Sequence, residues 1–403
     1  MSDRRDSDNP RWKSALLGLA DPAERGYDAV KRRLSGRFDR DDPVQILPYR
    51  GFGTSERALL SGRVLQNEPV GAAGEKDSVW KNLGNMWKRF ESDEVPHARL
   101  RAGFRGWSGE VVADEEGYFR IEARPAAPPE PGRLWHDLDL ELLDPAYPGV
   151  RATGSVLVPP QDAEFGVISD IDDTVVETGV TKRLVMARTV FLGNARTRLP
   201  FKGVAAFYDA LCQGVTPGCN NPIFFVSSSP WNLYDLLIEF MELQSIPRGP
   251  LLLRDFGLDR RKLFHAPSPE HKLRCIRPIL DLYSHLRFIL IGDSGEQDPE
   301  IYRQVVREYP GRILAIYIRR IGTALGRDDR VLELAKEIRD EGVPMLLVPD
   351  TEAAAVHAAD SGWIRWAKVP EVHEEKVKDE TAPSPTEVAL KTDAGAGPSS
   401  GPS

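Results

Sequence analysis

The chain has 403 residues and a formal net charge of −8 at pH 7, and 41% of its residues are hydrophobic. This length predicts two or three domains, because single hydrophobic cores stop growing before it. The acidic balance disfavours nucleic acid as a partner, since domains that bind nucleic acid are usually basic. The three cysteines have no paired spacing, and no stretch approaches the ~18 uncharged apolar residues of a membrane-spanning helix. We therefore expect a cytoplasmic protein in a reducing compartment.

Residues 1–41 are predicted to form an N-terminal helical segment. Trp12, Leu16 and Leu19 recur at helical spacing, so one side of this helix is apolar. Such a helix either docks on its own domain or lies in a membrane interface, and the sequence leaves both interpretations open.

Residues 42–160 are predicted to form an antiparallel β-sandwich-like domain with a helical insert at 78–92. Three leucines between 138 and 142 alternate with acidic residues, and this period of two is typical of a strand with one buried face. A second alternating run follows a turn at 114–117. Residues 109–121 together resemble the hairpin of prealbumin-like β-sandwiches.

Residues 161–370 are predicted to form an α/β domain. Apolar runs of strand length, separated by helical segments, occur at 165–169, 223–226, 250–253, 288–291, 313–318 and 344–348. This alternation predicts a doubly wound parallel sheet with its active-site loops at the carboxyl ends of the strands. From residue 371 the chain turns to Glu, Lys, Pro, Ser and Gly, so 371–403 is predicted to be a disordered tail.

The first of these strands ends in a concentration of acid. Asp170, Asp172 and Asp173 lie close together, and Thr174 follows them. Negative charge gathered in this way is unfavourable without a cation, so the pattern predicts a metal site. One carboxylate can then act as a nucleophile toward a phosphate whose charge the metal offsets, while another handles protons. The plainer alternative is an acidic strand end that caps the next helix.

A calcium-binding EF-hand also begins with Asp-x-Asp, but the remaining positions do not fit. The turn glycine of that loop would be Val175, and its bidentate glutamate would be Thr181. The sequence therefore excludes a calcium loop of this kind.

Four segments, in the expected order, resemble the motifs of the haloacid dehalogenase (HAD) superfamily of phosphohydrolases. They are Asp170-Ile171-Asp172-Asp173-Thr174, the strand from Ile223 to Ser227, Lys272 at the start of a predicted helix, and the run from Gly292 to Asp298. Residues 160–350 resemble, more narrowly, the phosphatidate phosphatase domain of the actin-patch-associated phosphatase family and its bacterial relatives. Residues 227–231, 271–272 and 291–300 carry this narrower resemblance.

The resemblance implies a Mg²⁺-dependent phosphatase that works through an aspartyl-phosphate. It implies that Asp170 is the nucleophile and that Asp172 serves as acid and then as base. Ser227, Lys272 and Thr174 would contact the phosphate, and Thr174 would also brace its loop. The implied metal ligands are Asp170, Asp172, Asp293 and Asp298.

The intervals between the motifs bear on the substrate. About 50 residues separate Thr174 from Ile223, and one helix and one strand occupy most of 231–271, so neither interval has room for a large cap domain. An uncapped site favours a macromolecule or a lipid headgroup at a surface. The resemblance implies phosphatidate or a related lipid phosphate, hydrolysed to diacylglycerol and phosphate.

Residues 181–202 include six basic residues and no acidic residue. This basic segment either attracts anionic lipid, giving peripheral contact with a membrane, or is an ordinary solvated helix face. Two other functions stay open. One is a phosphatase of phosphoproteins or soluble phosphomonoesters, and the other is a scaffold protein with a vestigial phosphatase fold.

Overall fold

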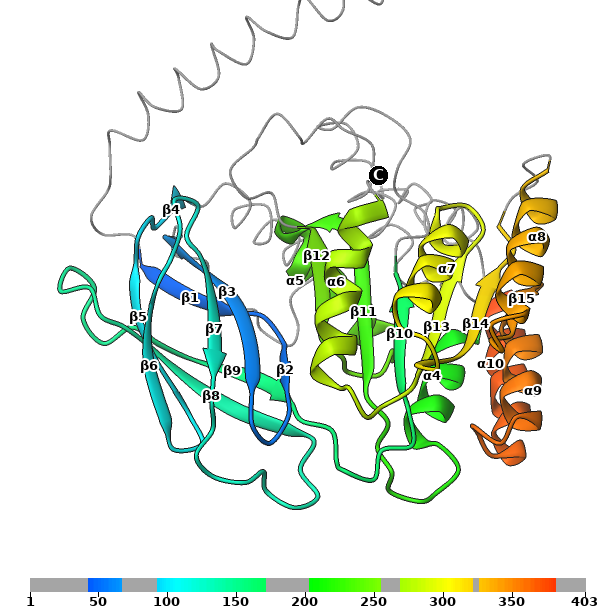
Figure 1. Cartoon of the computed structure of the whole chain (residues 1–403). Coiled ribbons are helices and arrows are strands. Elements are labelled where there is room, and N and C mark those ends of the chain that lie inside the picture. Colours follow the sequence, from blue (N-terminus) through cyan, green and yellow to red (C-terminus); the bar gives the residue numbers. More distant parts are fainter. Residues whose placement is uncertain (1–42, 67–92, 172–202, 255–268, 322–325, 382–403) are drawn as a thin grey trace, which may run out of the picture.

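The fold is that of a computed structural model, which describes residues 43–66, 93–171, 203–254, 269–321 and 326–381. Two sheets lie side by side in it (Figure 1). The predicted N-terminal helical segment 1–41, the insert at 78–92 and the basic segment 181–202 lie outside the described residues. Within the described ranges, no helix is both long enough and apolar enough to cross a bilayer.

The first sheet contains nine strands within the part of the chain that the structure describes. They are β1 (Val44–Pro48), β2 (Gly51–Gly53), β3 (Ala58–Gln66), β4 (Asp93–Glu94), β5 (Arg99–Phe104), β6 (Trp107–Val112), β7 (Tyr118–Ala123), β8 (Trp135–Leu142) and β9 (Arg151–Leu157). Their order is β1-β3-β2-β9-β8-β5-β6, and β4 and β7 also pair with β3. Among the described pairs, only β2 and β9 run parallel to each other. Apart from this one parallel pair, the predicted antiparallel architecture is confirmed.

Apolar and polar residues alternate along these strands, and the apolar residues form the core of this sheet. In β8 the side chains of Leu138, Leu140 and Leu142 are buried, while Asp137 and Asp139 are exposed. The inward residues of β3 and β7 join those of β5 and β8 in one apolar cluster. Strands from different parts of the sheet therefore enclose a common core, as the period of two predicts.

The predicted hairpin at 109–121 is wrong in its pairing. The turn is present, because Asp114 Oδ1 accepts hydrogen bonds from the backbone N–H groups of Glu116 and Tyr118, both at 2.9 Å. However, β6 pairs with β5 and β7 pairs with β3. The turn thus carries the chain from one strand ladder to another, because β6 already forms a hairpin with the preceding strand β5 and β7 pairs with β3.

The second sheet is parallel and has strands on both sides of β10. Its strands are β10 (Gly166–Asp170), β11 (Ile223–Pro230), β12 (Leu251–Arg254), β13 (Phe288–Asp293), β14 (Ile313–Arg319) and β15 (Met345–Val348), in the order β12-β11-β10-β13-β14-β15. All residues of β10 and β13 are buried, which is typical of central parallel strands covered on both faces. Each strand coincides with one of the predicted apolar runs.

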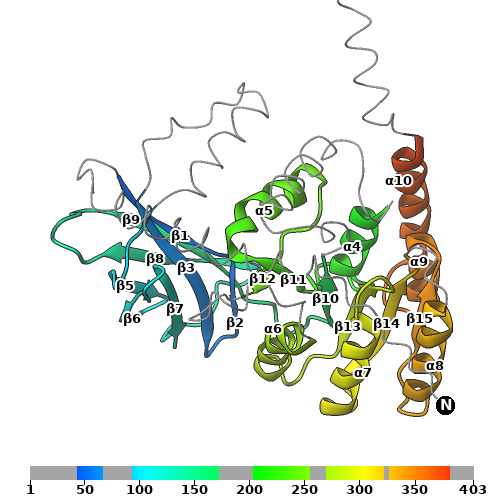
Figure 2. The same ribbon diagram turned by 90° about the horizontal axis from the view of Figure 1, so that it is seen from above.

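Helices cover both faces of the parallel sheet (Figure 2). One face is covered by α4 (Val204–Gln213), α5 (Tyr234–Leu243), α9 (Thr351–Asp360) and α10 (Val369–Thr381), and the other by α6 (Pro269–Leu282), α7 (Asp298–Glu308) and α8 (Arg327–Arg339). Successive residues of a strand point to opposite faces, so Ile289 joins the first cluster and Leu290 the second. The predicted α/β architecture is therefore confirmed.

The predicted start of the disordered tail at residue 371 is wrong, because α10 continues to Thr381. Val372 is fully buried, and Glu375 Oε2 accepts a hydrogen bond of 2.7 Å from the backbone N–H of Ala206 in the first turn of α4. Lys376 lies within 2.7 Å of a carboxylate oxygen of Asp350. These tertiary contacts order a helix whose own sequence is mostly polar. Residues 382–403 lie outside the described part.

The two sheets contact each other through aromatic residues. Tyr49, just after β1, stacks on Trp231 with ring centroids 4.4 Å apart and an angle of 13° between the planes. Phe52 in β2 meets the edge of Phe224 in β11 at 5.6 Å. Buried aromatic area and favourable ring geometry both stabilise this contact, so the first sheet rests directly on the elements that surround the parallel sheet.

Candidate active site

Two adjacent strands of the parallel sheet deliver acidic residues to the same edge. β10 ends at Asp170 and β13 ends at Asp293, and the two strands pair in parallel. The chain proceeds from β10 to β11 on one side, and β13 lies on the other side. Loops diverge at such a switch in strand order, and this leaves a crevice at the carboxyl ends of the strands. The sequence predicts active-site loops at the carboxyl ends of the strands, and these acidic residues lie at that edge of the sheet.

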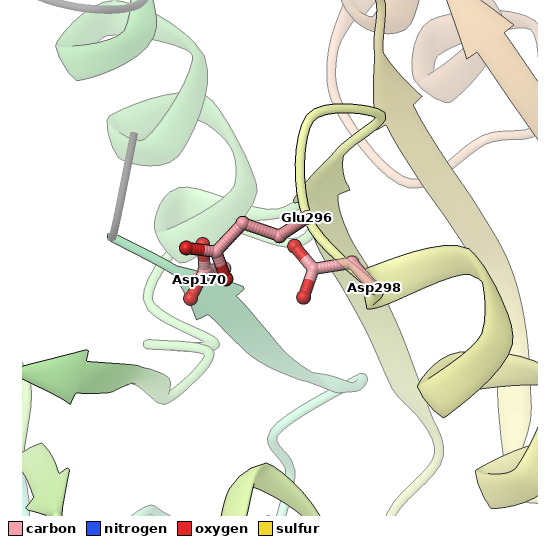
Figure 3. A group of neighbouring side chains, drawn as sticks. All are labelled: Asp170, Glu296 and Asp298. Carbon is pink, nitrogen blue, oxygen red and sulfur yellow. The ribbon is translucent and has the colours of Figure 1, made fainter. Parts of the chain in front are cut away.

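Three carboxylates and one ammonium meet at this edge. Lys272, in the first turns of α6, places Nζ 2.7 Å from Asp170 Oδ1, 2.8 Å from Glu296 Oε2 and 2.6 Å from Asp298 Oδ1. Figure 3 shows the carboxylates of Asp170, Glu296 and Asp298 gathered together, from the end of β10, the loop after β13 and the first residue of α7. We call these three residues the acidic triad.

Asp170 and Asp298 of the triad are buried and Glu296 is partly exposed, and this burial determines the electrostatics of the site. Asp298 has no exposed side-chain area and Lys272 only 3%. Burial alone would lower the pKa of Lys272, but the three surrounding carboxylates hold that pKa well above its ordinary value. The ammonium is therefore charged at any physiological pH. Three carboxylates and one ammonium leave a formal net charge of −2 at the site.

This donor set fits a hard divalent cation. One ligand atom from each triad residue lies within 4.8 Å of the others, and carboxylate oxygens are the ligands that Mg²⁺ prefers. A charge of +2 would balance the residual −2 that the lysine leaves. The residues present therefore fit a divalent metal site of the kind that the sequence predicts, and Asp170 and Asp298 are among the predicted ligands while Glu296 is not.

Asp293 lies beside the triad and has a different local role. Its Oδ1 accepts hydrogen bonds from the backbone N–H groups of Gly295 at 2.7 Å and Glu296 at 3.0 Å, while its own N–H donates to Asp298 Oδ2 at 3.1 Å. Burial, followed by the nearby Asp298 carboxylate, raises the pKa of Asp293. Asp293 thus shapes the turn that presents Glu296 and stands close enough to add charge to the site.

Arg327 clamps the loop that carries Glu296. From the first turn of α8, its Nε donates to Ser294 O at 2.7 Å and its guanidinium also donates to Glu296 O. The same guanidinium forms an ion pair of 2.6 Å with Glu300 in α7. A planar guanidinium can hold several acceptors at fixed angles. Arg327 therefore ties the loop between β13 and α7 to the start of α8.

Ser227 lies within β11 and close to Asp170 in the sheet, because Asp170 pairs with the preceding residue, Val226. Ser227 is fully buried. Its Oγ accepts a hydrogen bond of 3.0 Å from the backbone N–H of Ser229, and its carbonyl oxygen lies 3.1 Å from His271 Nε2. His271 thereby links the β11 loop to α6, next to Lys272 in sequence. The contact with the Ser227 carbonyl oxygen is enough to explain the position of His271, so no catalytic role is needed to account for it.

The structure brings together three of the predicted site residues, Asp170, Lys272 and Asp298. Asp172 and Thr174 lie outside the described residues, so their roles stay predictions. Glu296, which the structure brings against Lys272, is not among the predicted site residues. It stands in the acidic run after β13, and its spacing of two residues before Asp298 was the available signal. Arg327 was also missed, and no local pattern marks it.

Comparison with known proteins bears on this same segment. Residues 165–320 match the model of the family described as phosphatidate phosphatase APP1, catalytic domain. The predicted resemblance is confirmed. Every member of the acidic triad and Lys272 lie within the matched residues, whereas Arg327 lies beyond them.

Two relatives extend this result. The phosphatidate phosphatase APP1 of Saccharomyces cerevisiae is 36% identical over 228 residues, which are 56% of this chain and 37% of that protein. An uncharacterized protein of Schizosaccharomyces pombe is 31% identical over 157 residues, which are 38% of this chain and 25% of that protein. The matched stretch thus covers well under half the length of these relatives. A carbohydrate acetylesterase from Xanthomonas citri covers 72% of both chains at 14% identity, but its TM-score of 0.23 carries no argument about the fold.

Proposed function

We propose that this chain is a Mg²⁺-dependent phosphatase of the HAD type, which hydrolyses phosphatidate or a related lipid phosphate to diacylglycerol and phosphate. The observation that carries this proposal is the acidic triad around Lys272, which lies within the segment that matches the phosphatidate phosphatase catalytic domain. We include in the proposal the division into an N-terminal β-sandwich-like domain and a catalytic domain from residue 161.

The proposed reaction gives each of these residues a defined role. A carboxylate oxygen of Asp170 attacks phosphorus, and the bond from phosphorus to the leaving oxygen breaks. Lys272 and Ser227 donate to the phosphoryl oxygens as negative charge develops on them. Asp172 protonates the leaving oxygen and later removes a proton from the water that releases phosphate from Asp170. The bound Mg²⁺ would offset the charges of the carboxylates and the phosphate, and the residues that would hold it are Asp170, Asp298, Glu296 and Asp293.

Two alternatives remain as rivals to this proposal. A phosphatase of phosphoproteins or soluble phosphomonoesters would use the same residues. A scaffold with a vestigial site is disfavoured, because a buried lysine surrounded by three carboxylates is unfavourable to keep unless it has a use. Peripheral contact with a membrane through the basic segment 181–202 is part of the proposal. It predicts that activity on anionic vesicles falls as salt rises.

The deciding experiment measures phosphate release from phosphatidate in detergent micelles and from a soluble phosphomonoester. We expect release from phosphatidate that EDTA abolishes and Mg²⁺ restores. The Asp170→Asn variant should be inactive but folded, and Asp329→Asn, at an exposed position of α8, should retain full activity. A metal-independent activity, or an active Asp170→Asn variant, would refute the proposed mechanism. Faster hydrolysis of the soluble substrate would favour the first alternative.

A further inference from the structure

A cavity of about 360 Å³ lies where the first sheet meets α6 and β12. Elements of the first sheet and α6 stand side by side in both views (Figures 1 and 2). The volume falls near the lower end of the range of about 300–1,000 Å³ that is usual for small-molecule sites. The cavity therefore has room for a small ligand.

One part of the wall of this cavity is apolar and aromatic, and polar groups line the rest. Tyr49 and Trp231, which stack on each other, line it together with Phe52, Phe119 and Leu253. Rings held in place by stacking and burial offer contact area to a ligand without a large further loss of conformational freedom. An apolar or aromatic ligand body would gain free energy by leaving water here.

The charged residues of the lining favour an anion. Arg120 in β7 and Arg274 in α6 both line the cavity and are both exposed. Within the described ranges, neither guanidinium has a hydrogen bond or an ion pair. Arg50 also lines the cavity, but it is paired with Glu242 at 2.5 Å. The acidic lining residue Asp114 is occupied by the turn before β7, where it accepts two backbone hydrogen bonds.

We propose that this cavity is a second binding site, for a small anionic amphiphile. The carboxylate or phosphate head group of the ligand is bound by Arg120 and Arg274, and its apolar body lies among the aromatic walls. Guanidinium groups bind both kinds of head group through charge-assisted hydrogen bonds. Because Arg120 lies in β7 of the first sheet and Arg274 lies in α6, the ligand would also join the first sheet to α6.

The second site is separate from the acidic triad. The residues of α6 that line the cavity are His271, Arg274, Cys275 and Pro278, which are spaced three and four residues apart and so share one face of the helix. Lys272 projects from another face toward the triad. Binding in the cavity therefore requires neither Mg²⁺ nor turnover, and the proposal does not rest on the proposed function.

The test is calorimetric titration of the full chain in EDTA with decyl phosphate and decanoate, each below its micelle-forming concentration. We expect saturable binding of one or both anions, weakening as salt rises. Decyl glucoside, which lacks the charge, and acetate, which lacks the apolar body, should bind much more weakly. Equal binding of either control would overturn the proposal, because each lacks one of the two features that the cavity recognises.

Variants test whether the anions bind in this cavity. The double variant Arg120→Ala and Arg274→Ala should raise the Kd about tenfold or more, while the matched removal of two exposed charges in Arg124→Ala and Arg287→Ala should leave it unchanged. Asp170→Asn should bind as the wild-type chain does. Circular dichroism checks that each variant is folded. Equal losses in both double variants, or loss of binding in Asp170→Asn, would overturn the assignment to this cavity, as would the absence of binding to the wild type.

Discussion

Replacing Lys272 with methionine is the most direct test of the electrostatics of the acidic triad. The substitution keeps a long side chain but removes the ammonium that lies within 2.6–2.8 Å of three carboxylates. Removing one partner of a buried ion pair destabilises a protein by about 3–5 kcal/mol, because the opposite charge stays buried. Each kcal/mol shifts the melting temperature by about 2–4 °C in a domain of this size, so we expect a fall of about 6–20 °C in EDTA.

Magnesium should reverse part of this loss. If the triad binds Mg²⁺, the cation replaces some of the missing positive charge, so added Mg²⁺ should raise the melting temperature of Lys272→Met more than that of the wild type. The assay is thermal unfolding with EDTA and with saturating Mg²⁺. Lys336→Met, at an exposed position of α8, is the matched control and should be nearly neutral. If Lys272→Met had the same melting temperature as the wild type in EDTA, the argument would be refuted, since the carboxylates would then need no cation.

Three further predictions concern single residues. Asp293→Asn should raise the Mg²⁺ concentration for half-maximal phosphate release about 10- to 100-fold, because the charge beside the triad is lost. If this concentration were unchanged, the role of Asp293 would be limited to the turn. Arg327→Gln should also raise this requirement by freeing the loop that carries Glu296, and an unchanged Mg²⁺ titration would contradict the clamp. Hydrogen bonding to Arg277 lowers the pKa of Glu308 to about 2; since the pair is about one-third exposed, Glu308→Gln should lose about 1 kcal/mol at pH 7. Because this stabilisation exists above the ordinary carboxyl pKa and disappears as pH falls toward 2, urea unfolding should show a smaller difference at pH 3 than at pH 7.

Local sequence determined the elements of the parallel sheet and the position of the site along them. The runs that became β10 and β13 are mostly apolar and end in an aspartate, so burial on both faces and an acidic carboxyl end could be predicted without the rest of the chain. The placement of Lys272 in a helix also followed from its neighbours. These features depend on periodicity and on the chemistry of adjacent residues, which a sequence displays directly.

Tertiary structure decided which strands pair and where the ordered chain ends. The turn at Asp114 predicts a hairpin of β6 with β7, but β6 pairs with β5, which directly precedes it, and β7 pairs with β3, which is distant in the sequence. Likewise, α10 is mostly polar, and its order depends on the hydrogen bond from Ala206 to Glu375, 169 residues away in sequence. The pairing of β7 with β3 and the contact of α10 with α4 leave no local signal in the sequence.

The same reason explains which carboxylates form the triad. The sequence predicts both Asp293 and Asp298 as ligands, and the structure adds that Asp293 Oδ1 shapes a turn and that Glu296 lies against Lys272. That choice depends on the conformation of one loop, and the loop is held by Arg327, 31 residues beyond Glu296. The sequence by itself determines that carboxylates gather at this edge, because strand ends place them there. Which oxygens face the lysine is decided by long-range contacts that exist only in the folded chain.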